Sequence, residues 1–361
     1  MTSNKNIFIF GNYGLNTGDN AMLFSLLSHY KYYSLELFIL SNIPLNFLPS
    51  SKKINFVEYN PLNILNSIRK SSIFIMGGGT PFFDYGSSFK RFKILFILFL
   101  IILWAKIFTN KIYFIGTGIE TPSTKWGYFI MENMHKLADL IILRDSFSYN
   151  VLKQMKLKKD PIISFDLASL LEIPEIKKSK EKVIGISILP INETKYNNPN
   201  KDLLFITKIA SALDYWLDLN NEYNLKIFIF SKKEEHGDLE IIKTLQKMMK
   251  NKVEVVKFDP NPLNITKKVA ECEFFLGMRY HSCLFAYITE TPLIMIETFE
   301  KTLSLANDVK LPSAAVISID EILKGDLKDY LQKIHTHPEK FRAIVPVKEM
   351  KKLVKSSLDL I

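Results

Sequence analysis

Short apolar segments alternate with longer helix-like segments along most of the chain, and this alternation restricts the fold more than any other feature. In the first half the predicted strands are 7–10, 35–40, 72–76, 111–115 and 140–143. The predicted helices among them are 20–29, 94–108 and 126–138. Strands that are apolar throughout and alternate with helices predict a parallel sheet that is covered by helices on both faces.

A charged segment that contains a proline, 172–182, interrupts this rhythm and is predicted to be a linker. The rhythm then restarts. The predicted strands are 183–188, 226–230, 253–257, 273–276 and 293–296, and the predicted helices include 203–219, 238–249 and 282–289. A chain of 361 residues has room for two domains of about 100–200 residues each. We therefore predict an α/β protein of two doubly wound, Rossmann-like domains, 1–171 and 183–361.

The composition excludes several classes of protein. Apolar residues make up 47% of the chain and charged residues 23%, which excludes a disordered or collagen-like chain. Two cysteines, Cys272 and Cys283, exclude a disulfide-built scaffold, and no Cys/His spacing predicts a metal site. The formal net charge of +10 indicates an anionic partner: nucleic acid, a membrane, or a phosphate or carboxylate substrate. Nucleic acid is disfavoured, because no recognition motif accompanies the basic clusters such as 177–180 and 351–352.

The membrane option depends on one apolar run, 94–105, which is flanked by Lys90, Arg91, Lys93 and Lys106. A spanning helix needs about 20 such residues, so the run is too short to cross a bilayer. Two interpretations remain: a helix buried in an α/β domain, which the missing amphipathic pattern favours, or a helix on an anionic membrane surface. The N-terminus lacks a signal-peptide pattern, so we expect a cytoplasmic protein, either soluble or peripheral at the inner face of the membrane.

Two glycine-rich loops follow predicted strands, where parallel sheets bind ligands. The first, 11–19, includes Gly14 and ends at Asp19, and its spacing matches neither a dinucleotide fingerprint nor a phosphate-binding P-loop. We interpret it as a ligand-facing loop; the alternative is an ordinary turn in which Asp19 caps a helix. The second loop contains Gly77, Gly78 and Gly79, with Asp84 nearby. Three adjacent glycines cost conformational entropy, so we expect their backbone N–H groups to face a substrate.

A third loop, 277–282, places Arg279 and His281 two residues apart after a strand. Arginine offers a bidentate fork for phosphate or carboxylate, and histidine exchanges protons near neutral pH. The alternative is a helix N-terminus with a capping histidine. We favour a catalytic loop because the pair leaves a strand end together.

Two further cations follow strands. Arg144 comes after the strand 140–143, and Lys301 comes after the strand 293–296. For Arg144 the alternative to a binding role is a local ion pair with Asp145, and for Lys301 it is a solvated loop. Both remain candidate substrate-binding residues.

Taken in order, these segments resemble the polysaccharide pyruvyl transferase family. The family's glycine-rich opening, its G-G-G loop with a following aspartate, its R-D-x-x-S and D-x-A elements and its G-M-R-x-H signature are similar to 11–19, 77–84, 144–148, 166–168 and 277–281. Thr291-Pro292 is similar to the family phrase that follows the signature. The segments 116–122 and 297–301 depart from the family pattern, which leaves the acceptor preference and the role of Lys301 open.

The resemblance implies a fold similar to GT-B glycosyltransferases and transfer of pyruvate from phosphoenolpyruvate to two sugar hydroxyls, which forms a cyclic ketal. It implies no cofactor. The partners are phosphoenolpyruvate and a glycan acceptor of a cell-envelope or extracellular polysaccharide, free or lipid-linked. His281 and Arg279 become the expected catalytic residues. The expected substrate-binding residues are Arg144, Gly14, Asp19, Gly77, Gly78, Gly79, Asp84 and Lys301. The alternatives are a GT-B glycosyltransferase with a nucleotide-sugar donor and a non-catalytic glycan-binding scaffold.

Overall fold

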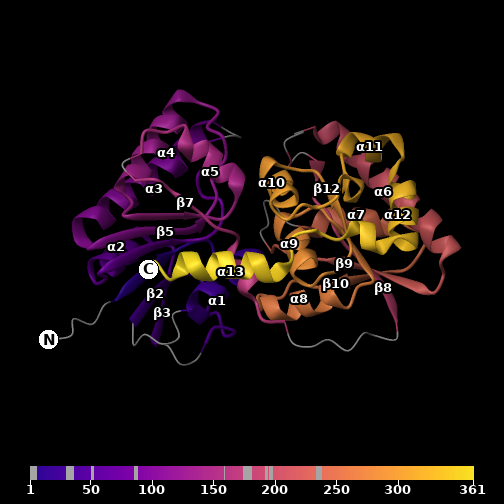
Figure 1. Ribbon diagram of the computed structural model, residues 1–361, viewed down its shortest axis with the longest axis horizontal. Coiled ribbons are helices and arrows are strands. Elements are labelled where there is room, and N and C mark those ends of the chain that lie inside the picture. Colours follow the sequence, from indigo (N-terminus) through magenta and orange to yellow (C-terminus); the bar gives the residue numbers. More distant parts are fainter. Residues whose placement is uncertain are drawn as a thin grey trace. The chain divides into compact units, whose positions relative to one another are not determined.

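The computed structural model describes residues 6–29, 36–49, 53–84, 88–157, 159–173, 181–191, 194, 198–232 and 238–361. The chain divides into two compact units (Figure 1). The first unit comprises Met1–Gly14, Asp19–Leu170 and Met350–Ile361, and the second comprises Leu15–Gly18 and Leu171–Glu349. Each unit is built on one parallel sheet with helices, so the predicted doubly wound α/β class is confirmed.

The first sheet has the strand order β3-β2-β1-β4-β5-β6-β7, and all neighbouring strands are parallel. Its strands are β1 (Ile7–Phe10), β2 (Glu36–Leu40), β3 (Lys53–Val57), β4 (Ile73–Gly77), β5 (Lys111–Thr117), β6 (Leu140–Leu143) and β7 (Ile162–Ile163). The helices of this part of the chain are α1 (Thr17–His29), α2 (Pro61–Arg69), α3 (Ser88–Phe108), α4 (Lys125–Leu137), α5 (Ser146–Lys153) and the 3₁₀ turn Leu167–Leu170.

The second sheet has the order β10-β9-β8-β11-β12-β13 and is also parallel. Its strands are β8 (Lys182–Ser187), β9 (Tyr223–Phe228), β10 (Val253–Val256), β11 (Phe274–Gly277), β12 (Leu293–Ile296) and β13 (Val316–Ile317). The helices are α6 (Asp202–Leu219), α7 (Asp238–Met248), α8 (Pro262–Ala270), α9 (Tyr280–Ile288), α10 (Glu300–Asp308), α11 (Ile319–Lys324) and α12 (Leu327–Thr336), with 3₁₀ turns at Pro199–Lys201, Ser313–Ala315 and Pro338–Phe341. The last helix, α13 (Val347–Leu358), begins in the second unit and continues into residues that group with the first.

In each sheet the order in which the chain adds strands reverses at one point. The predicted loops lie at the carboxyl ends of the strands beside these points. In the first sheet the chain starts at β1, moves outward through β2 and β3, and returns to β4 on the other side of β1. In the second sheet β8 and β11 are the corresponding neighbours. Ligands of open parallel sheets bind beyond the carboxyl ends of the strands at such switch points. The loops after β1, β4 and β11 are the three glycine-containing loops that the sequence singles out.

The division into units differs from the expected domains 1–171 and 183–361 in two segments. Residues 350–361 group with the first unit, where Val354 and Leu358 are buried and Ser357 Oγ lies 2.7 Å from Ser164 Oγ. Residues 15–18 group with the second unit. Each segment groups with the other unit than the one expected from its position in the sequence. The periodicity of the sequence does not contain this information. Residues 174–180 of the expected linker 172–182, with the basic cluster 177–180, lie outside the described residues.

Helix α3 contains the apolar run 94–105, and it is buried along one face only. Leu95, Leu98, Ile102 and Ala105 pack into the core of the first unit, whereas the opposite face exposes large apolar side chains. The expectation of a buried helix is therefore wrong for the outer face of α3. None of the helices in the described ranges has the length and apolar content that crossing a membrane requires.

Candidate functional site

The first two glycine-rich loops meet at the carboxyl ends of β1 and β4, as the sequence predicted for loops at one edge of a sheet. The hydroxyl of Tyr13 donates to the carbonyl oxygen of Gly77 at 2.6 Å. A Cβ at Gly79 would lie 3.7 Å from Asp19 Oδ1, so the Asp19 carboxylate lies beside the second loop. Burial and the charge of Asp19 raise the pKa of Tyr13 well above its usual value. Tyr13 is thus a protonated donor that joins the two loops.

The second loop needs glycine for its backbone conformation, and its N–H groups are used inside the unit. Gly78 and Gly79 have φ angles of 77° and 76°, in the left-handed region that favours glycine. The N–H of Gly78 donates to the carbonyl of Ile115 at 2.8 Å, and that of Gly79 points to Met22 Sδ at 3.3 Å. The expectation that these two N–H groups face a substrate is therefore wrong.

Gly14 also has a structural reason to be glycine. Its φ is 98°, its N–H donates to Asn20 Oδ1 at 2.7 Å, and a Cβ would fall 2.8 Å from Ile43 Cγ1. A side chain at this position would be strained and would clash. The structure thus explains Gly14 by the turn that it makes, and a contact of Gly14 with substrate stays a prediction.

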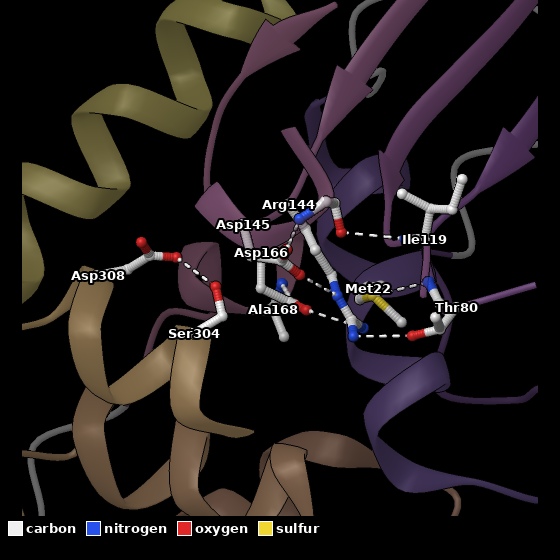
Figure 2. A network of polar contacts seen from close by, with 11 residues as sticks. Met22, Thr80, Ile119, Arg144, Asp145, Asp166, Ala168, Ser304 and Asp308 are labelled. Atoms are coloured by element: carbon white, nitrogen blue, oxygen red, sulfur yellow. Dashed lines mark hydrogen bonds and ion pairs between the residues drawn. The ribbon is translucent and has the colours of Figure 1, made fainter. Parts of the chain in front are cut away.

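Arg144 is 2% exposed and ties together the ends of neighbouring strands of the first sheet (Figure 2). Its Nη2 donates to Thr80 Oγ1 at 2.8 Å, its Nε to Asp145 Oδ2 at 3.1 Å, and its Nη1 lies 3.8 Å from Asp166 Oδ2. A Cβ at Gly118 would fall 2.9 Å from the same Nε. The guanidinium thus contacts the loops after β4, β5, β6 and β7. Its charge faces two buried carboxylates, which fits a structural tie better than an exposed clamp.

Asp84 is buried and holds the start of α4. Its carboxylate accepts from the backbone N–H and the hydroxyl of Ser123, at 2.7 and 2.9 Å, and from the backbone N–H of Thr124 at 2.8 Å and its hydroxyl. Thr124 is the N-cap of α4. Four donors saturate the acceptor capacity of a carboxylate. The structure therefore gives Asp84 a structural role, and a role in binding substrate stays a prediction.

In the second unit, residues 15–18 add to the carboxyl end of β9. The N–H of Thr17 donates to the carbonyl of Phe230 at 3.0 Å, and the N–H of Lys232 donates to the carbonyl of Leu15 at 2.9 Å. The hydroxyl of Thr17 donates to the carbonyl of Asp259 at 3.0 Å. The second half of the first loop is therefore fixed to the second sheet, which sequence reasoning missed.

His281 lies in the first turn of α9, directly against Gly18. A Cβ at Gly18 would fall 2.1 Å from both Cγ and Nδ1 of the imidazole. The ring also packs edge-on against Tyr280, with the ring centres 5.1 Å apart. Gly18 is thus required by the close approach of the imidazole. The first and third predicted loops meet here, since one supplies the glycine and the other the histidine.

Arg279 is held by a buried carboxylate that sequence reasoning did not single out. Its Nε donates to Asp238 Oδ1 at 2.6 Å, and its Nη2 forms an ion pair with the same oxygen. The other oxygen of Asp238 accepts from the backbone N–H groups of Phe230 and Ser231, at 2.7 and 3.2 Å. One edge of the guanidinium is thereby fixed in direction. The only sequence signal for Asp238 is its position at the start of a helix after a strand.

Lys301 lies in the first turn of α10, with its Nζ 4.6 Å from the centre of the Phe299 ring. The preceding residues contact the Arg279 loop, since Thr298 Oγ1 donates to the carbonyl of Met278 at 3.2 Å. Lys301 therefore belongs to a segment that supports the third loop. Its role toward substrate stays a prediction.

Metal and thiol chemistry have no visible site in the described ranges of the chain. These ranges contain no group of three or more His, Cys, Asp or Glu that could hold a metal ion. Cys272 and Cys283 are buried and free, and burial raises the pKa of each thiol, to about 12 for Cys283. Neither thiol is ionised near neutral pH, so neither is a ready nucleophile.

A family model identifies the family of the chain, and solved structures show what its fold is similar to. The family model described as polysaccharide pyruvyl transferase matches residues 16–298. No curated protein matches the sequence. Among solved structures, Anabaena HepE in complex with UDP-glucose is similar with a TM-score of 0.63 at 10% identity, covering 99% of this chain and 100% of that one. UDP-GlcNAc 2-epimerase from Neisseria meningitidis bound to UDP-GlcNAc gives 0.59 at 13% identity, with 99% and 100% covered. WaaG, a glycosyltransferase involved in lipopolysaccharide biosynthesis, gives 0.58 at 11% identity, with 99% of each chain covered.

Proposed function

The chain belongs to the polysaccharide pyruvyl transferase family, and from that premise we propose that it transfers pyruvate from phosphoenolpyruvate to two hydroxyls of one sugar. The product is a cyclic ketal on a cell-envelope or extracellular polysaccharide. The main support for this proposal is the position of His281. Its imidazole packs against Gly18, and it lies two residues after Arg279 in the segment that follows β11. This loop follows β11 at the switch point of the second sheet, where ligands of such sheets bind.

The reaction needs proton transfers that an imidazole can perform. Protonation of C3 of phosphoenolpyruvate makes C2 electrophilic, and the first sugar hydroxyl adds to C2. Phosphate then leaves C2 with its bridging oxygen, and the second hydroxyl adds to close the ketal. The two hydroxyl protons balance the proton gained by C3 and the one carried away by phosphate. We propose that His281 delivers or relays these protons, which is general acid–base catalysis.

Arg279 supplies the positive charge that this reaction needs. Phosphoenolpyruvate carries a phosphate and a carboxylate, and a guanidinium binds either with directed hydrogen bonds. Asp238 fixes the direction of that guanidinium by its contact with Nε and Nη2. We propose that Arg279 binds an anionic group of the donor and that Asp238 positions it. No cofactor enters this reaction scheme.

We also propose where the reaction takes place and which kind of glycan accepts the pyruvate. We place the reaction in the cytoplasm, because phosphoenolpyruvate is a metabolite of that compartment. A polysaccharide precursor in the cytoplasm is commonly attached to a lipid carrier, so we propose a lipid-linked glycan as the acceptor. We further propose that Asp19, Gly77 and Lys301 bind substrate, and the predicted substrate contacts of Gly14 and Asp84 belong to the same proposal.

A second candidate function is transfer of a sugar from a nucleotide-sugar donor. It is favoured by the fold likeness to WaaG, a glycosyltransferase, and to HepE, which is bound to UDP-glucose. A thermal-shift comparison separates the two candidates, because a ligand that binds the folded state raises the melting temperature. We expect stabilisation by phosphoenolpyruvate and none by nucleotide sugars.

The experiment that tests the proposed reaction measures release of inorganic phosphate from phosphoenolpyruvate. A panel of lipid-linked and soluble glycans serves as acceptors, and His281→Ala serves as the inactive control. Acceptor-dependent phosphate release by the wild type supports pyruvyl transfer. Transfer of a sugar from a nucleotide sugar to the glycan, with release of the nucleotide and no phosphate release from phosphoenolpyruvate, would instead support the glycosyltransferase.

A further inference from the structure

Helix α3 belongs to the first unit, where Figure 1 labels it. One of its faces exposes large apolar side chains to solvent. Phe89 and Ile107, near its two ends, are 79% and 71% exposed, and Phe96 and Leu100 between them are also exposed. On the neighbouring α4, Phe129 is 65% exposed. We call the four exposed residues of α3 (Phe89, Phe96, Leu100 and Ile107) the α3 patch. Exposed apolar surface that gathers on one face marks a site of interaction with a partner or a membrane.

The residues of the patch lie on one face of a regular α-helix. Residues 89, 96, 100 and 107 are separated by seven, four and seven positions, which keeps them on one stripe of an α-helix. The residues that the helix buries, Leu95, Leu98, Ile102 and Ala105, lie on the opposite stripe. Helices α2 and α4 pack beside α3 and leave its outer stripe uncovered within this unit.

Basic side chains surround the patch without acidic ones on the same helix. Helix α3 contains Lys90, Arg91, Lys93 and Lys106 and no Asp or Glu. Lys90 and Lys93 are exposed near the N-terminal end of the helix. Arg91 lies over the ring of Phe83, with 4.0 Å from its Cζ to the ring centre, and Lys106 pairs with Asp139 at 3.4 Å. The exposed face of α3 therefore combines apolar side chains with the cations Lys90 and Lys93 near its N-terminal end.

This combination fits one occupant, a membrane with anionic headgroups. The helix spans about 32 Å along its axis, at about 1.5 Å per residue. A helix with an exposed apolar stripe and cations beside it binds lipid by lying along the membrane surface. A second copy of the chain, docked through the same helix, would bring like charges together with no acidic residue on α3 to offset them.

We propose that the α3 patch docks the first unit on an anionic membrane, with α3 in the plane of the interface. The apolar stripe enters the boundary between headgroups and acyl chains, and Lys90 and Lys93 contact lipid phosphates. This inference rests on the surface of the first unit and is independent of the reaction proposed above. It holds or fails whichever donor the enzyme uses.

The test is cosedimentation of the full chain with vesicles of phosphatidylcholine alone or of equal parts phosphatidylcholine and phosphatidylglycerol. We expect binding to the anionic vesicles only, weakened by salt. Replacing Lys90 and Lys93 by Gln should lower the partition coefficient about thirtyfold, from about 1 kcal/mol for each basic residue. The matched control, Lys243→Gln with Lys247→Gln on α7, removes the same charge from exposed positions of the second unit and should bind like the wild type.

A second pair of variants tests how much the exposed apolar side chains contribute to membrane binding. Replacing Phe89 and Ile107 by Ser should abolish binding without lowering the melting temperature, because both side chains are exposed. The matched control replaces Leu203 and Leu219, exposed on α6, by Ser and should bind like the wild type. Equal binding by the α3 and α6 variants, or no binding by the wild type, would overturn the proposal. A dimer in sedimentation equilibrium that only the α3 variants lose would also overturn it and identify a second copy as the occupant.

Discussion

Gly18 lies so close to His281 that a single methyl group at Gly18 would overlap the imidazole, 2.1 Å from its Cγ and Nδ1. The two residues are far apart in sequence and come from the first and third predicted loops. The backbone of the first loop, at Gly18, thus packs directly against the imidazole of the proposed catalytic residue. This relationship joins two motifs that the sequence shows only in linear order.

Gly18→Ala should displace His281 and lower turnover about a hundredfold, since a misplacement of about 1 Å costs that much in a positioned reaction. The measurement is phosphate release at saturating phosphoenolpyruvate. The control is Gly325→Ala, because Gly325 has φ 109° and nothing lies within 4 Å of an added Cβ, so the change strains the backbone away from the site and should lower stability without lowering turnover. Wild-type turnover by Gly18→Ala would show that the contact between Gly18 and His281 does not position the imidazole for catalysis.

Asp238→Asn and Arg279→Lys should each weaken phosphoenolpyruvate binding about tenfold, which is about 1.4 kcal/mol. The first change releases the guanidinium from its buried partner, and the second removes the planar fork. Because both act on one interaction, the double variant should lose little more than either single variant. Calorimetry measures the affinities, with Asp308→Asn as a control elsewhere in the second unit. Additive losses would contradict a positioning role for Asp238.

Arg144→Gln should lower the free energy of unfolding by about 3–5 kcal/mol, because it leaves Asp145 and Asp166 buried without their cation. Thr80→Val, which removes one hydrogen bond to the same guanidinium, should cost about 1 kcal/mol. Urea unfolding measures both. If Arg144→Gln instead keeps wild-type stability and only raises the KM for phosphoenolpyruvate, Arg144 is a substrate clamp and not a structural tie.

His135 predicts how stability changes with pH. Burial lowers its pKa from 6.5 to about 4 in the folded chain, with the ring between Phe82 and Phe114. The unfolded chain therefore takes up this proton at higher pH than the folded one. Stability contributed by the neutral ring is complete above pH 6.5 and is lost as the pH falls toward 4, up to about 3 kcal/mol.

The check is urea unfolding of the wild type and His135→Gln at a series of pH values across this window. The wild type should lose stability more steeply on acidification than the variant, whatever the stability of each at neutral pH. His337→Gln, at an exposed histidine, is the control and should follow the wild type. Parallel curves for the wild type and His135→Gln would refute the assignment.

Periodicity was enough to predict both parallel sheets, because uniformly apolar strands between helices have few other packing solutions. It also placed the loops after β1, β4 and β11 at ligand-binding edges. It could not show that residues 15–18 pair with the segment that follows β9, since that contact joins segments more than two hundred positions apart. The fixed direction of Arg279 was also hidden, because Asp238 contacts it from the start of α7, 41 positions away. The exposed stripe of α3 was hidden because both faces of that helix are apolar.

The central claim is that the chain forms a pyruvate ketal on a glycan, and the most direct measurement is mass spectrometry of the acceptor after incubation with phosphoenolpyruvate. We predict a product heavier than the acceptor by one pyruvic acid minus one water, with one inorganic phosphate released per ketal. His281→Ala should give neither. An unmodified acceptor across the whole panel, or a product that carries a sugar from a nucleotide-sugar donor, would contradict the claim.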